Sequence, residues 1–421
     1  MTSDNTAAAA MPPELVQVRL PVWWTFGGLV AGLMAGIAMS GSTAFPAIMA
    51  VVEPIGAMWL RALQMTIIPL VASLLVLGIT QMTAAARAGP VAVRMLATMF
   101  LVLAGGAIAT AVVIPLLLSA FPVPDGAAAL LLANTGTTAQ EVPGVGDFLT
   151  SLVAPNLVAA AAETAMLPLT IFFALFAVAT AGLPMGQQQM LVGFFHAVAN
   201  AMLTIIGWVL WLAPAGVFAL ALGVSASSGA DAFGALAHYI TVVSAMGLVV
   251  LVAAYLLGML ALRGKGGGFA GAMLPAQAVA ISTQSSLASL PAMLDSARRL
   301  KLRETTAEFV LPLAVAIFRS TSPAMNLAVA IYVAYLAGVE LTPATLAAGI
   351  GVALIISVGS VSLPGSISFV ISIAPIALAM GVPIEPLAIL VAVEMLPDII
   401  RTLANVTMNV AVTASVDRSV D

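Results

Sequence analysis

A stripe of polar residues marks the last apolar segment of the chain, in the run PDIIRTLANVTMN. Asp398, Arg401, Asn405 and Asn409 are spaced three or four residues apart, so a helix would place them on one face. The planar guanidinium of Arg401 can bind a carboxylate through two parallel hydrogen bonds. Asp398 can accept hydrogen bonds from an ammonium, and Asn405 can bond a second carboxylate. A solute with two carboxylates and one amine would satisfy all three. The alternative is a structural Asp398–Arg401 pair that joins two helices.

A further charge interrupts the apolar run FVLPLAVAIFRSTSPAMNLAVAIYVAYLAG, residues 309–338, where Arg319 lies near the middle. An ionisable side chain in a membrane span costs about 2.5–3.5 kcal/mol on insertion scales and usually faces the protein interior with a partner. Arg319 is therefore a candidate functional residue. The alternative is that its long side chain snorkels into a cytoplasmic vestibule.

The composition indicates which elements must position these residues. The chain has 62% hydrophobic and 7% charged residues, whereas soluble domains carry about 25% charged residues. Its apolar runs are about 20 residues or longer and do not alternate, which predicts membrane-spanning helices rather than a barrel. There is no cysteine. No nucleophile–base set or metal cluster is evident, so we expect no enzyme activity, no cofactor, no metal and no nucleic-acid partner.

The first part of the chain predicts spans at about 22–41, 46–80, 90–120, 150–182, 187–224 and 233–262. Two later segments, 264–299 and 341–381, are apolar but are broken centrally by Ser, Gly and Pro. Such paired interruptions are typical of re-entrant helical hairpins that line a transporter's binding site. The alternative is two helices kinked at proline.

The distribution of Lys and Arg predicts the orientation. The basic residues gather at alternate ends of the spans, and the opposite ends carry acidic residues without Lys or Arg. This pattern requires each interrupted segment to enter and leave on one side, the first from the cytoplasm and the second from outside. We expect an all-α integral membrane protein with about eight transmembrane helices plus two re-entrant hairpins, multi-pass in the plasma (inner) membrane with both termini cytoplasmic.

Several motifs along the chain are shared with one known family. They are LRALQMTIIPLVASLLVLGI (60–79), NLVAAAAETAMLPLTIFFALF (156–176), LAPAGVFALAL (212–222), STQSSLASLP (282–291), FVLPL (309–313), SVGSVSLPGS (357–366) and DIIRTLANVT (398–407). By these motifs the chain resembles the glutamate/aspartate transporter family, the dicarboxylate/amino acid:cation symporters. The likeness extends through nearly the whole chain, and the serine-rich hairpin together with the Asp-x-x-Arg-Thr-x-x-Asn helix is its most specific part.

The resemblance implies a homotrimer of elevator-type transporters, each with a fixed scaffold and a transport domain that slides across the membrane. The implied parts are a cytoplasmic N-terminal tail (1–20), scaffold helices (21–80), a transport-domain helix (81–121), scaffold helices for trimerisation (122–224), a transport-domain helix (225–262), the first hairpin (263–303), a seventh helix with Arg319 (304–338), the second hairpin as outer gate (339–381), an eighth helix with the substrate site (382–416) and a C-terminal tail (417–421).

The resemblance also assigns roles at the site. Asp398 matches the residue that binds the substrate amine, Arg401 the side-chain carboxylate, and Asn405 the main-chain carboxylate. Gln284 stands where archaeal members often have arginine. The further substrate-binding positions implied are Ser285 and Ser286 at the first hairpin tip, Ser362, Leu363 and Gly365 at the second, and Ser322 and Thr402 beside the stripe.

The chain departs from the family at its cation sites. The family's Asn-Met-Asp-Gly-Thr signature is replaced by residues 318–322, Phe-Arg-Ser-Thr-Ser, which removes a carboxylate and an amide. The degraded positions are Phe318, Ser320 and Asn409, and on the third span Met99, Val102 and Leu103. Hard cations such as sodium need oxygen ligands. Arg319 would then place a fixed positive charge where the family binds a mobile one.

The sequence therefore predicts a sodium-independent carrier of aspartate or glutamate, either proton-coupled or equilibrating its substrate. Candidate proton carriers are Asp398, Glu394 and Glu163. Two rivals stay open. One is a sodium-independent C4-dicarboxylate carrier, and the other is an anion-conducting, channel-like member in which Arg61, otherwise without a role, serves the anion path.

Overall fold

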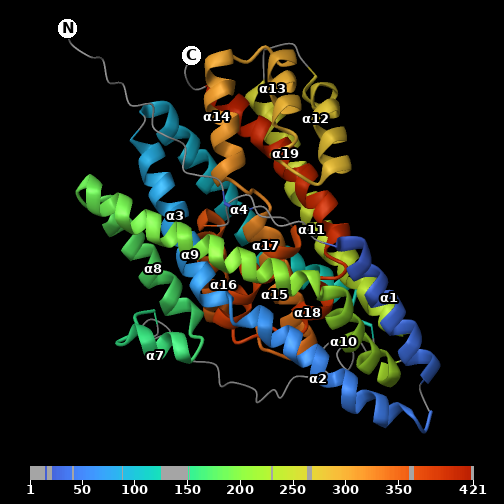
Figure 1. Cartoon of the computed structure of the whole chain (residues 1–421). Coiled ribbons are helices and arrows are strands. Elements are labelled where there is room, and N and C mark those ends of the chain that lie inside the picture. The colour runs from blue at the N-terminus through green and yellow to red at the C-terminus, as the bar shows by residue number, and fades with distance from the viewer. Residues whose placement is uncertain are drawn as a thin grey trace.

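The computed structural model describes residues 15–16, 21–39, 42–87, 89–124, 150, 152–228, 231–262, 268–359 and 365–418. Every regular element in these ranges is a helix (Figure 1). Within them, six helical segments are long and apolar enough to cross a membrane. The prediction of a multi-pass helical membrane protein is therefore confirmed.

One group of helices comes from the first half of the chain. Helix α1 packs against α10, and α3 packs against α8 and α9. Helices α1 and α10 approach so closely that a Cβ atom on Gly28 would lie only 2.4 Å from the carbonyl oxygen of Pro214, which requires a glycine there. The helices of this group are α1 (Val22–Met39), α2 (Phe45–Gln64), α3 (Ile67–Ala86), α7 (Leu157–Ala162), α8 (Met166–Ala181), α9 (Met185–Trp211) and α10 (Ala213–Ser228).

Three spans predicted as continuous are each two helices. The span expected over 46–80 is interrupted at Met65 and Thr66, between α2 and α3. The spans over 150–182 and 187–224 divide in the same way, into α7 with α8 and α9 with α10. Pro69, Pro168 and Pro214 stand in the first turn of α3, α8 and α10. A proline ring clashes with the carbonyl four residues earlier, so each of these prolines favours a break at this point.

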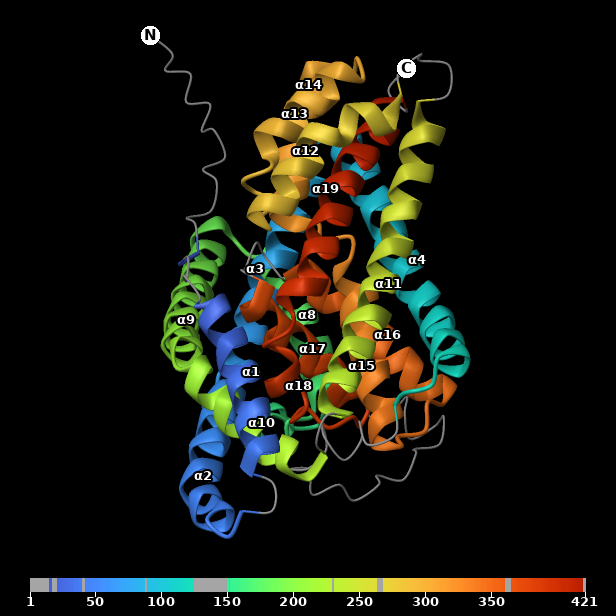
Figure 2. The ribbon, with the colours of Figure 1, turned by 90° about the vertical axis from the view of Figure 1, so that its right-hand side faces the viewer.

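A second group surrounds the polar stripe. Helix α11 (Asp231–Ala261) packs along α19 (Met395–Arg418), and α4 (Pro90–Ala120) packs against α15 (Ser322–Ala337). Figure 2 shows α1, α2, α9 and α10 on one side of the molecule and α4 and α11 on the other.

The seventh helix, predicted over 304–338, is broken in the middle. Helix α14 (Glu304–Ile317) ends before Phe318, whose backbone is extended, and α15 begins at Ser322. Pro323 lies in the first turn of α15, where its ring would clash with the carbonyl of Arg319 in a continuous helix. The break therefore falls at Arg319.

The two interrupted segments form helix pairs. Helix α12 (Phe269–Thr283) packs against α13 (Leu290–Arg299) through a turn that begins with Gln284 in the left-handed region, at φ 49°. Helix α16 (Pro343–Gly359) packs against α17 (Gly365–Ala379), and the connection 360–364 lies outside the described residues. Each pair packs side by side, which a single helix kinked at proline would not do, and Pro275 and Pro375 lie inside helices that continue past them. Figures 1 and 2 place α12–α13 near one end of the molecule and α16–α17 toward the other.

The eighth helix differs from its prediction at both ends. The short helix α18 (Leu387–Leu390) and a turn precede α19, which begins at Met395 rather than near 382. A C-terminal tail was expected from 417, but α19 continues to Arg418. Asp417 is buried there and its carboxylate accepts a 2.8 Å hydrogen bond from Arg303 Nε, which holds the last turn in place.

Candidate functional site

The first turns of α19 hold a buried charged centre. Glu394 lies in the turn just before the helix, Asp398 in its first turn and Arg401 in the next. Their exposed fractions are 1%, 7% and 9%. Charged groups are almost never buried to this degree unless they are paired, and the contacts of Arg401 show how the pairing is made.

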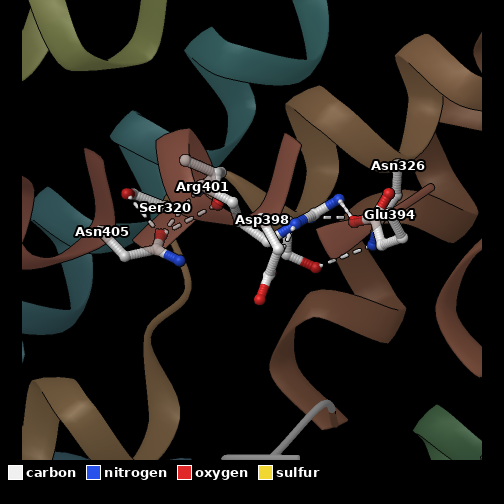
Figure 3. A network of polar contacts seen from close by, with 8 residues as sticks. Ser320, Asn326, Glu394, Asp398, Arg401 and Asn405 are labelled. Atoms are coloured by element: carbon white, nitrogen blue, oxygen red, sulfur yellow. Dashed lines mark hydrogen bonds and ion pairs between the residues drawn. The ribbon is translucent and has the colours of Figure 1, made fainter. Parts of the chain in front are cut away.

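The Arg401 guanidinium contacts three acceptor side chains (Figure 3). Its Nη2 donates to Glu394 Oε1 at 2.8 Å, and its Nη1 donates to Asn326 Oδ1 at 2.9 Å. Its Nε lies 3.4 Å from Asp398 Oδ1, a longer ion pair. A ligand carboxylate that binds Arg401 must therefore replace one of these internal partners or share the guanidinium with it.

Arg319 adds a second positive charge to this centre. The charges of Asp398 and Arg401 act on the Arg319 guanidinium, and Arg319 in turn acts on Asp398. The ionised centre thus contains two carboxylates, Glu394 and Asp398, and two guanidiniums, so its charges balance. Arg319 is half-buried at the helix break and interacts electrostatically with Asp398, which fits the interior position predicted for it.

Asn405 ties the helix break to α19. Its side-chain oxygen accepts hydrogen bonds from Ser320 Oγ at 2.9 Å and from the Thr321 amide and hydroxyl at 3.0 Å each. The amide nitrogen makes none of these bonds and points away from Ser320 (Figure 3). Asn405 was predicted to bond a substrate carboxylate. Only its amide nitrogen is placed to do so, because a carboxylate needs a donor.

Asn326 connects the centre to the start of α15. Its Nδ2 donates to Ser322 Oγ at 3.1 Å while its oxygen accepts from Arg401. Ser322, a predicted substrate residue, is therefore linked to Arg401 through the Asn326 side chain. Thr402 is buried on α19 beside Arg401.

The predicted hairpin-tip residues are only partly described. Ser285 and Ser286 lie half-buried in the turn between α12 and α13, and the Ser285 hydroxyl accepts from the Ala288 amide at 3.2 Å. Gly365 is the first residue of α17, and Ser362 and Leu363 lie outside the described residues. No described hydrogen bond joins Ser285 to the Arg401 centre.

The positions predicted to be degraded cation ligands comprise four apolar side chains, one bonded serine and one amide without a partner among the described residues. Phe318, Met99 and Leu103 are buried hydrophobic side chains, and Val102 is partly buried. Ser320 donates its hydroxyl to Asn405. Asn409 is 1% exposed, and neither atom of its amide has a hydrogen-bond partner among the described residues.

Sequence reasoning missed two partners of Arg401. Glu394 was considered only as a proton carrier, although it precedes Asp398 by four residues and so extends the same stripe. No sequence pattern marks Asn326 as a partner of Arg401, because this contact depends on how α15 packs against α19. Two other candidates lie elsewhere. Glu163 is exposed in the turn after α7, and Arg61 is exposed in the last turn of α2.

Comparison with known proteins identifies the family of this chain. A family model described as the sodium:dicarboxylate symporter family matches residues 22–419. The chain is 27% identical to a proton/sodium-glutamate symport protein of Bacillus subtilis, over 91% of this chain and 89% of the relative. It is 27% identical to a proton/glutamate-aspartate symporter of Escherichia coli, over 85% and 82%. It is 28% identical to C4-dicarboxylate transport protein 1 of Pseudomonas aeruginosa, over 70% and 64%.

The buried Asp398–Arg401–Asn405 arrangement and a family match that spans almost the whole chain lead to one conclusion: this protein belongs to the sodium:dicarboxylate symporter family, a family of transporters rather than enzymes.

Proposed function

We propose that this protein carries acidic amino acids, aspartate or glutamate, across the inner membrane without using sodium. The observation that carries the proposal is Arg401, a buried guanidinium held between two carboxylates and an amide. A substrate's side-chain carboxylate would take the place of Glu394 on Arg401. Its ammonium would bind Asp398, and its main-chain carboxylate would accept from the free side of the Asn405 amide.

Asp398 favours an amino acid over a plain dicarboxylate. A substrate without an ammonium would bring two negative charges beside Asp398 and offer it no donor, which is unfavourable in a buried site. The second candidate is a C4-dicarboxylate carrier, favoured by the likeness to the Pseudomonas aeruginosa protein.

The sodium-independent mode rests on Arg319 and on the lost oxygen ligands. A cation bound near the helix break would balance the negative charge of Asp398 and of the substrate, and a covalently attached guanidinium can do so permanently. Phe318 and Ser320 are buried, and neither side chain supplies a carboxylate that could bind a cation. A charge that cannot dissociate cannot carry the energy of an ion gradient, so Arg319 replaces the ion but not its coupling.

The elevator mechanism and the homotrimer are part of the same proposal. Helices α1–α3 and α7–α10 form one packed group, as a scaffold would. Helices α4, α11 and α12–α19 form the other around the charged centre, with α16 and α17 facing α3 and α8. This division supports a mobile domain that slides along α3 and α8.

The test is uptake of radiolabelled aspartate into proteoliposomes, with sodium and pH gradients imposed separately. Uptake that an inward sodium gradient does not change, and that unlabelled glutamate inhibits better than succinate, is the expected result. Sodium-driven uptake rejects the ion assignment. Better competition by succinate moves the function to the dicarboxylate carrier.

A further inference from the structure

The three acceptors of Arg401 are not equivalent, because one of them is neutral. Glu394 and Asp398 are carboxylates in or just before the first turn of α19, the helix that carries Arg401 itself. Asn326 is an amide on a different helix, α15, and its Oδ1 accepts from Arg401 Nη1 at 2.9 Å. Asn326 is buried, with 3% of its surface exposed. A buried neutral group that bonds Arg401 from another helix is a candidate positioning residue.

The orientation of the Asn326 amide follows from the chemistry of its two partners. A guanidinium can only donate hydrogen bonds, so the amide oxygen must face Arg401. The Nδ2 atom then faces Ser322 Oγ, one turn earlier on α15, and donates to it at 3.1 Å. Every residue in the range 322–334 is buried, so both side chains belong to a helical segment that is enclosed by its neighbours. Asn326 therefore holds Arg401 Nη1 from a well-packed helix.

A substrate carboxylate at Arg401 would meet these acceptors differently. Asn326 and Glu394 bind the two terminal nitrogens of the guanidinium and lie together at its end (Figure 3). A carboxylate that arrives there is repelled by the charge of Glu394 but not by the neutral amide. The amide is thus the partner that can stay bonded while the substrate takes the place of Glu394. An Nη1 that stays bonded spares the site the entropy cost of ordering a long side chain when the substrate binds.

We propose that Asn326 is a positioning residue of the substrate site, a neutral anchor that keeps Arg401 in place while carboxylates exchange on it. The inference rests on the proposed function, and it adds that the lack of charge on Asn326 lets the site accept an acidic substrate. The other two acceptors of Arg401, Glu394 and Asp398, already carry two negative charges. A third charge at position 326 would hold the guanidinium more tightly and would repel a substrate carboxylate.

Two substitutions separate the charge of this residue from its packing. Asn326→Asp keeps the size of the side chain and an acceptor for Arg401 but adds a charge, whereas Asn326→Ala removes the acceptor. Calorimetric titration with aspartate measures the affinity of each variant that keeps a cooperative thermal transition in detergent. We expect Asn326→Asp to weaken binding about a hundredfold or more, because like charges meet in a buried site. Asn326→Ala should weaken it about two- to tenfold, because Arg401 must then be ordered on binding.

A purely structural role for Asn326 predicts the reverse order, because Asn326→Asp retains both the shape and the bond. Affinity in Asn326→Asp that equals or exceeds the affinity in Asn326→Ala therefore overturns the proposal. Unchanged affinity in Asn326→Ala also overturns it, and this second result does not depend on whether the charged variant folds.

The matched control is Asn156→Asp, the same chemical change at an exposed residue whose side chain caps the start of α7. Asparagine and aspartate cap helices about equally well, so aspartate affinity should equal that of the wild type. All titrations are repeated with succinate. A wild type that binds succinate but not aspartate rejects the proposed substrate, and the order of the two Asn326 variants with succinate then decides the role of Asn326.

Discussion

Helix α19 holds two buried polar regions that differ in how well they are bonded. Arg401 is 9% exposed and is bonded to Glu394 and Asn326, with Asp398 close by. Two turns further along, Asn409 is 1% exposed and neither of its amide atoms has a partner among the described residues. The first region is a network of bonded charged groups in which Glu394 Oε2 is left without a partner among the described residues, whereas the second is a single amide with both atoms unbonded.

The difference indicates which buried polar groups require partners. A buried charge without partners is so unfavourable that Arg401 requires its acceptors even when no substrate is present. A buried amide without partners costs only about 1–3 kcal/mol and can persist. Asn409 stands where the resemblance places a cation ligand, and neither atom of its amide has a partner among the described residues. The Arg401 network has partners that a substrate can replace, and Asn409 has none.

Removing the guanidinium should have the greatest consequence. Arg401→Cys is expected to abolish aspartate binding, at a loss of about 2–5 kcal/mol, because the substrate carboxylate loses its partner and Glu394 and Asp398 are left poorly paired. Calorimetric titration of the purified protein measures this. Arg61→Cys, at an exposed arginine on α2, is the control and should bind normally. Native affinity in Arg401→Cys would show that the first region is structural.

Neutralising Asp398 should separate the two candidate substrates. Asp398→Asn is expected to weaken aspartate binding by about 1.5–3 kcal/mol, the usual contribution of a hydrogen bond to a charged group. The affinity for succinate, which has no ammonium, should fall little or even rise. Competition of both compounds against labelled aspartate gives the ratio. Equal weakening of both would favour the dicarboxylate carrier.

Replacing Arg319 should have a smaller effect, because it acts on the substrate through Asp398 and the helix break. Arg319→Met is expected to weaken aspartate binding about tenfold, or about 1.4 kcal/mol. Added sodium should not rescue it, since Ser320 and Asn409 supply no carboxylate. Arg94→Met, at an exposed arginine on α4, serves as the control. Unchanged affinity in Arg319→Met would mean that Arg319 only snorkels.

Replacing Asn409 should have the smallest effect and the opposite sign. Asn409→Leu removes two unbonded polar atoms with little change in volume, so the free energy of unfolding is expected to rise by about 1 kcal/mol. Aspartate affinity should not change. Thermal unfolding in detergent, with Asn326→Leu as the bonded counterpart that should destabilise, checks the sign. A lower melting temperature for Asn409→Leu would show that its amide is bonded in the membrane.

The stripe on α19 was predictable because its signal is local. Spacings of three and four residues place Asp398, Arg401 and Asn405 on one face whatever packs against them. The two helix pairs were visible for a similar reason, since Ser, Gly and Pro interrupt otherwise apolar segments. These features depend on short windows of sequence.

The partners of the stripe were not predictable, because they depend on tertiary packing. Nothing in the sequence around Asn326 indicates that α15 brings it to Arg401. Asn405 was predicted to bond a substrate carboxylate, and the bonds of its oxygen to the helix break were not predicted. The break itself was missed because residues 309–338 form one apolar run in hydropathy. Its local signal was Pro323, which conflicts with a helical carbonyl at Arg319.

The most direct test of a permanent charge in place of a bound ion is the affinity of the wild-type protein for aspartate in sodium, potassium and choline chloride. The three solutions are matched in ionic strength, and the dissociation constant is measured by calorimetry at one pH. If Arg319 replaces the cation, the three constants are equal within error. Tighter binding in sodium chloride than in choline chloride, by about tenfold or more, would contradict the proposal.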